Sequence, residues 1–98
     1  MTEEFQPYDT EGLIERFEEM VKKDETIFFD VDQFEAIIDH YFERNEINML
    51  STAVAFAMEQ HPANTMVHLK RARLLMIQGK YKRALKLLND LEEIEPAN

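Results

Sequence analysis

The sequence predicts an all-α protein of about five helices, packed as antiparallel helix-turn-helix pairs. The signature His-Pro-Ala-Asn at residues 61–64 recurs as Glu-Pro-Ala-Asn at residues 95–98, a period of 34 residues. Such a period in an apolar, helix-forming stretch is typical of stacked two-helix units, because one pair alone cannot bury its apolar face. The short apolar run at residues 27–29 has no second strand signal to pair with, so we expect a connector there.

We divide the chain into a lead-in and capping helix at residues 1–30, a first repeat at 31–64 and a second repeat at 65–98. Asp9 or Thr10 is placed to cap the first helix. The apolar residues of that helix share an arc of about 120°, and its other face is charged. We therefore expect it to cover the open end of the repeat stack. The arc consists of Leu13, Ile14, Phe17, Met20 and Val21.

The first repeat is expected to hold helices at residues 31–44 and 47–60. Asp30 and Gln33 form a capping-box pattern that starts the first of them. Asn45 tolerates the left-handed conformation with which a chain leaves a helix. The second helix is almost free of charge, which predicts that it is buried on two sides.

The second repeat copies this plan, with helices expected at about residues 65–78 and 81–94. Gly79 lies between them as a left-handed exit from the first helix. That first helix carries apolar residues on almost every side, so the pattern predicts that it is covered nearly all round.

The second repeat carries a set of residues at characteristic spacings: Ala72, Gly79, Lys80, Tyr81, Ala84, Leu88 and Pro96. At these spacings it resembles a tetratricopeptide repeat. The first repeat matches the same pattern more loosely through Phe34, Tyr41, Ala57 and Pro62. Three positions depart from the pattern: His68 replaces the favoured Trp as a packed substitute, Ile38 replaces a small residue, and Leu50 replaces Ala. The resemblance implies a right-handed superhelix whose first helices line a concave groove for proteins or peptides.

Carried over by position, the resemblance implies a groove lined from both repeats. Its residues are Asp32, Glu35, Asp39, Phe42 and Glu43 from the first repeat, with Met66, Leu69, Arg73, Met76 and Ile77 from the second. Glu35 and Asp39 stand where a subset of the family uses Lys and Asn to hold peptide carboxylates. Like charges repel, so a basic protein or peptide is the expected partner. We call Asp32, Glu35, Asp39 and Glu43 the acidic stripe. Alternatively, this stripe is a solvated face and the apolar residues pack against adjacent helices.

The charge distribution argues against a nucleic-acid partner. Residues 1–64 carry 16 acidic and four basic side chains, a net charge of −12, whereas residues 65–98 carry four acidic and seven basic, a net charge of +3. Affinity for nucleic acid comes mostly from Lys and Arg. No apolar run reaches transmembrane length and no basic-then-apolar leader is seen, so we expect no membrane partner. The lack of cysteine fits a reducing compartment, and the cytoplasm is the expected location.

Catalytic and metal-binding patterns are weak. The only glycines are Gly12 and Gly79, so a phosphate-cradling loop is missing, and the chain has neither a cysteine nucleophile nor a recognisable Ser, His and Asp set. His40 and Glu43 lie three residues apart, but no third metal ligand is implied, and His61 is expected at an exposed turn. We expect no enzymatic activity, cofactor or metal, with an acidic-site hydrolase as the enzymatic alternative.

A structural role is the main alternative to peptide binding. The chain would then be the N-terminal cap and first repeats of a longer solenoid, acting in assembly or oligomerisation. The family's stacking geometry directs Leu74, Leu85 and Leu88 toward a following repeat. These residues would form an apolar association edge, and a two-fold homodimer through that edge is expected.

Overall fold

The computed structural model describes residues 9–94, and five helices cover most of that range. They are α1 (Thr10–Lys23), α2 (Val31–Arg44), α3 (Ile47–Gln60), α4 (Thr65–Ile77) and α5 (Tyr81–Ile94). The described range contains no strand, so the predicted all-α fold class is confirmed. The expected lead-in at residues 1–8 and the second signature at residues 95–98 lie outside the described residues.

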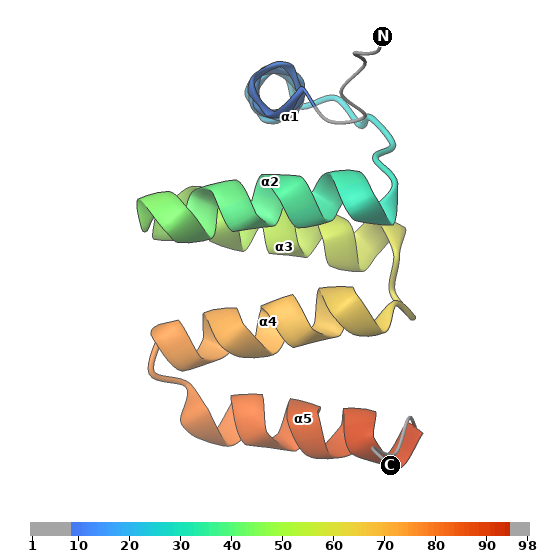
Figure 1. Ribbon diagram of the computed structural model, residues 1–98, viewed down its shortest axis with the longest axis vertical. Helices are drawn as coiled ribbons and strands as arrows, with labels where there is room; N and C mark the ends of the chain where they lie inside the picture. The colour runs from blue at the N-terminus through green and yellow to red at the C-terminus, as the bar shows by residue number, and fades with distance from the viewer. Residues whose placement is uncertain (1–8, 95–98) are drawn as a thin grey trace, which may run out of the picture.

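Helices α2 to α5 run back and forth across the molecule, whereas α1 crosses one end and is seen along its axis (Figure 1). Helix α2 packs against α3, and α4 against α5, in antiparallel pairs. Helix α4 also contacts both α2 and α3, so the second pair stacks on the first. The starts of α2 and α4 are 34 residues apart, as are those of α3 and α5. The spacing of the sequence signature is therefore also the spacing of the helices.

Local side-chain chemistry sets the ends of these helices. Asp30 and Gln33 form the predicted capping box at the start of α2, with hydrogen bonds of 2.8 and 2.9 Å to each other's backbone N–H. Asn45 leaves α2 with a φ of 56°, and Gly79 follows α4 with a φ of 77°. The Asn64 side chain caps α4 by accepting a hydrogen bond of 3.1 Å from a backbone N–H.

The hydrophobic core lies where α1 covers the α2–α3 pair. The Phe17 side chain of α1 is 0% exposed, and its ring lies 6.0 to 6.2 Å from the rings of Phe29, Tyr41 and Phe56. Aromatic pairs at this separation add to the stabilisation that burial itself provides. Helix α1 is thus joined to the first helix pair through its apolar face. The core also includes Leu13, Ile14, Met20, Phe34, Ile37, Ile38, Leu50, Ala53, Val54, Ala57, Val67 and Leu74.

The connector between α1 and α2 is held by the end of α3. The Gln60 side chain accepts a hydrogen bond from the Phe29 N–H at 2.9 Å and donates one to the Ile27 carbonyl at 2.8 Å. The His61 Nε2 forms a third bond, of 2.8 Å, with the Phe29 carbonyl. The prediction that His61 is an exposed turn residue was wrong: its ring is half-buried and packs edge-on against Phe34, because the connector folds back over it.

Candidate binding surface on α2 and α4

The ten predicted groove residues lie on two helices that run side by side in the same direction (Figure 1). Asp39 of α2 contacts Lys70 of α4, and Phe42 contacts Arg73, so both cross-helix pairs are separated by 31 residues. We call the ten residues together the α2–α4 surface. Continuing the same register back by one helical turn places Glu35 opposite Met66.

One carboxylate of the acidic stripe is already paired. The Lys70 Nζ lies 2.7 Å from Asp39 Oδ1, and the Lys70 side chain is only 17% exposed. Asp32, Glu35 and Glu43 are exposed and form no ion pair with any residue between 9 and 94. The stripe therefore offers three uncompensated carboxylates, fewer than the four that the sequence alone would suggest.

Phe42 is covered by a basic side chain from the second repeat. The guanidinium carbon of Arg73 lies 4.1 Å from the centroid of the Phe42 ring, a cation–π contact. Phe42 is half-buried under this contact. It therefore contributes to the packing between repeats more than to an open apolar surface.

The apolar part of the α2–α4 surface is open to solvent on α4. Leu69, Met76 and Ile77 are 48 to 49% exposed, and intervals of seven and eight residues place them on one side of the helix. The prediction that α4 is covered nearly all round was wrong, because its packing against α2, α3 and α5 leaves this sector uncovered. Met66 differs from these three, since it is half-buried and packs against the core.

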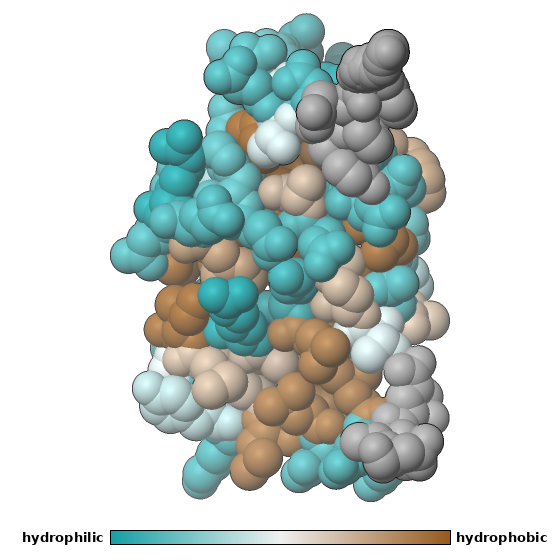
Figure 2. Space-filling model, in the orientation of Figure 1, coloured by the Kyte–Doolittle hydropathy of each residue, from teal (hydrophilic) through white to brown (hydrophobic). Residues whose placement is uncertain are grey.

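The predicted association edge is only partly present. Leu85 is 59% exposed and Leu88 36% exposed on α5, where Tyr81 is 66% exposed as well. Leu74 does not belong to this edge. It is only 5% exposed, because its position around the α4 helix directs its side chain into the core. Figure 2 shows apolar atoms gathered over α4 and α5 on one face of the molecule.

Two polar contacts were missed in the sequence because nothing local indicates them. The Tyr41 hydroxyl donates a hydrogen bond of 2.7 Å to the Glu18 carboxylate, joining α2 to α1. Burial and this bond raise the pKa of Tyr41. His68 forms a bond of 2.7 Å with the Pro62 carbonyl and so ties α4 to the turn before it. Neither contact lies on the α2–α4 surface.

The fold and this surface define an all-α protein of stacked helix pairs with an acidic and apolar face. Comparisons with protein-family models, with curated proteins and with solved structures found no match to this chain. Between residues 9 and 94, no helix is long and apolar enough to cross a membrane. The same residues include no group of three or more His, Asp or Glu side chains arranged to hold a metal ion.

Proposed function

We propose that this protein is a non-enzymatic interaction module of the tetratricopeptide-repeat type. It binds a basic segment of another protein at the α2–α4 surface. The observation that carries the proposal is that two helices packed against each other bear complementary exposed groups: three half-exposed apolar side chains on α4 and uncompensated carboxylates on α2. The 34-residue spacing of the helix starts supports the choice of repeat type. The cytoplasm is the proposed location, because a chain without cysteine does not need an oxidising compartment for disulfide formation.

The chemistry of the partner follows from this surface. Each apolar side chain of the size of Leu69 or Met76 contributes about 1.5 to 3 kcal/mol when it passes from full exposure to full burial, so half-exposed ones offer part of that. The carboxylates of α2 attract Lys and Arg and reject acidic segments. The partner segment therefore carries apolar side chains for α4 and basic ones for α2.

Arg73 and Lys70 restrict how such a segment lies. Both are basic and both contact α2, so a basic side chain of the partner is repelled near them and favoured near Glu35 and Asp32. The partner's basic residues are therefore expected at the N-terminal half of α2. Its apolar residues are expected over Met76 and the end of α4.

A binding experiment tests this proposal. A fluorescein-labelled peptide alternating lysine and leucine should bind the protein, with fluorescence polarisation as the readout. Glu35→Lys should weaken binding about tenfold at low salt, and added salt should reduce this difference because exposed charges are screened. Glu15→Lys changes the charge equally on the exposed face of α1, outside the α2–α4 surface, and is the matched control.

Two results would contradict the proposal. Equal weakening by Glu35→Lys and Glu15→Lys would mean that the peptide responds only to overall charge. Unchanged binding when leucine in the peptide is replaced by serine would mean that the apolar side chains of α4 take no part.

A structural role is the second candidate, and the exposed face of α5 favours it. Tyr81 and Leu85 are 66% and 59% exposed, so this face is available to a further helix pair or a second copy. In that case the chain acts as the cap and first repeats of a larger assembly. The two candidates use different helices and are separable by mutation.

A further inference from the structure

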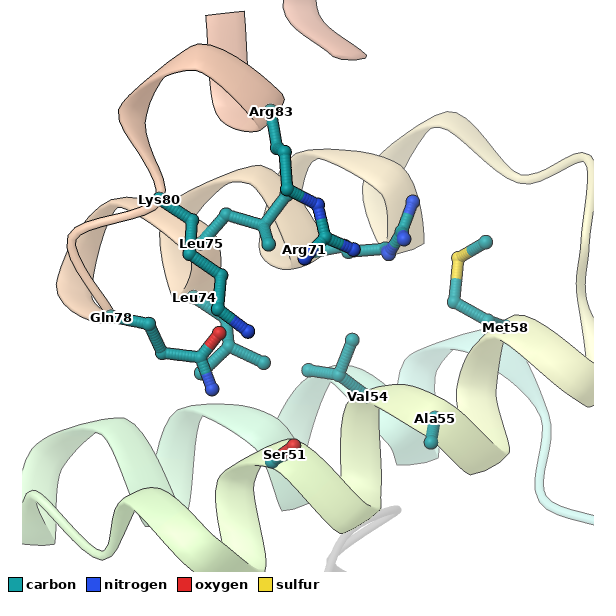
Figure 3. Close-up of a pocket in the computed structure, with 10 residues that line it drawn as sticks. All are labelled: Ser51, Val54, Ala55, Met58, Arg71, Leu74, Leu75, Gln78, Lys80 and Arg83. Carbon is teal, nitrogen blue, oxygen red and sulfur yellow. The ribbon is translucent and has the colours of Figure 1, made fainter. Parts of the chain in front are cut away.

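A groove lined by basic side chains lies on the side of α4 that faces away from the acidic α2–α4 surface. Helices α3 and α5 lie on either side of α4 without contacting each other, which leaves a groove of about 470 Å³ between them (Figure 3). We call it the α3–α5 groove. Val54, Ala55 and Met58 of α3 form one wall, and Leu74 and Leu75 of α4 add apolar atoms at its base.

Three basic side chains line this groove and no acidic one does. Arg71 of α4, Lys80 before α5 and Arg83 of α5 extend toward the space opposite α3 (Figure 3). None of the three forms an ion pair with a residue between 9 and 94. The nearest carboxylate on α3, Glu59, lines an adjacent hollow and not this one. The groove therefore concentrates positive charge in a protein whose net charge is −9.

We propose that the α3–α5 groove is a second binding site, which takes an acidic peptide segment with an apolar side chain. Guanidinium groups bind carboxylates through paired N–H donors, so Arg71 and Arg83 suit Asp or Glu. The apolar wall, on which Ala55 is exposed and Met58 half-buried, suits a leucine-like side chain between those carboxylates.

The remaining surface does not cancel this attraction. The groove and the acidic stripe lie on different sides of α4, and a helix with its side chains is about 10 to 12 Å across. Because charges are screened beyond about 8 Å at physiological salt, the stripe acts weakly on a ligand in the groove. The residues that line the groove include no aromatic ring on which a nucleic-acid base would stack. A short acidic peptide therefore fits the groove better than a nucleic acid does.

The test uses a fluorescein-labelled peptide alternating glutamate and leucine, with fluorescence polarisation as the readout. Arg83→Glu should weaken binding about tenfold, because a favourable contact becomes a repulsive one. Lys82→Glu is the matched control: it makes the same charge change one residue away, outside the groove lining, and should cost less than about twofold. Both residues are exposed, so both variants should fold, which circular dichroism checks.

The apolar contribution is tested separately. A peptide with serine in place of leucine should bind much more weakly, and Met58→Ser should weaken only the leucine peptide. Glu35→Lys on the α2–α4 surface should leave the acidic peptide bound, so failure of this site and failure of the proposed function are distinguishable.

Three outcomes would overturn the proposal. The first is equal loss of binding in Arg83→Glu and Lys82→Glu, which would make the effect one of overall charge. The second is no saturable binding of the acidic peptide to the unmodified protein. The third is self-association, measured by sedimentation, that Arg83→Glu abolishes, which would make a second copy of this chain the occupant.

Discussion

Lys70 of α4 forms an ion pair with Asp39 of α2, with 2.7 Å between Nζ and Oδ1. The pair joins the first helices of the two repeats and lies in the middle of the predicted acidic stripe. It explains why Asp39 is half-buried while Glu35, one turn earlier, is exposed. The stripe therefore serves in part as a contact between the repeats, and only its unpaired carboxylates are open to the proposed partner.

The Asp39–Lys70 pair should contribute measurably to stability. In a double-mutant cycle with Asp39→Asn and Lys70→Met, we expect a coupling energy of up to about 1 kcal/mol, reduced by solvent screening because the Asp39 side chain is 42% exposed. The Glu19–Lys23 pair, with side chains 55 and 60% exposed, is the control and should couple less. Urea unfolding measures both. The absence of any measurable coupling between Asp39 and Lys70 would show that the two residues do not link the repeats.

Phe17 should be among the most sensitive positions of the core. Phe17→Ala is expected to lower the free energy of unfolding by about 3 to 5 kcal/mol, because the fully buried ring leaves a cavity between α1 and the first helix pair. Phe28→Ala removes the same group from a side chain that is 67% exposed and should cost much less. Chemical denaturation compares them. If Phe17→Ala unfolded like the unmodified protein, α1 would not cover the core in solution.

Gln60 should hold the connector in place. Gln60→Ala removes two hydrogen bonds to the connector backbone and should cost about 1 to 3 kcal/mol. The amide of Phe29, which donates one of these bonds, should exchange its hydrogen faster in the variant. Gln78→Ala, at an exposed position after α4, is the control. Unchanged exchange at Phe29 would mean that other contacts alone position the connector.

Tyr41 should make stability depend on pH in alkaline solution. Its pKa is raised above the ordinary value of 10.0 by burial and by the bond to Glu18, so the folded state favours the protonated phenol. This contribution is fully present below about pH 10 and is lost as the pH rises further, because the unfolded chain ionises first. Thermal unfolding of Tyr41→Phe should show a weaker decline above pH 10. Parallel curves for the two proteins would refute this linkage.

The exposed face of α5 should support self-association if the structural role is correct. Leu85 is 59% exposed, so Leu85→Glu should lower the mass measured by sedimentation equilibrium at high protein concentration. Lys86→Gln changes the net charge by the same amount at the next position and should leave the mass unchanged. A monomer at all concentrations, with or without the substitution, would exclude a dimer through this face.

Sequence by itself determined the helices and their spacing. The capping box at Asp30 and the left-handed exits at Asn45 and Gly79 are local signals, each acting over a few residues, and the recurring signature adds the 34-residue period. Local signals are independent of how the helices pack, so the predicted bounds agree closely with those of α2 to α5. The apolar arc of α1 similarly identified the face that is buried.

Only the tertiary structure decided which side of α4 is covered. Leu74 is buried and Leu69 exposed although both are leucines on the same apolar helix, because the direction from which α2, α3 and α5 approach selects among its sides. The contacts of Asp39 with Lys70 and of Gln60 with the connector join residues that are 31 to 33 positions apart. No local pattern encodes such contacts. The Gln60 contacts form only when α3 lies against the connector, and the Asp39–Lys70 contact only when the two helix pairs stack. That stacking decides which charges on the α2–α4 surface remain free.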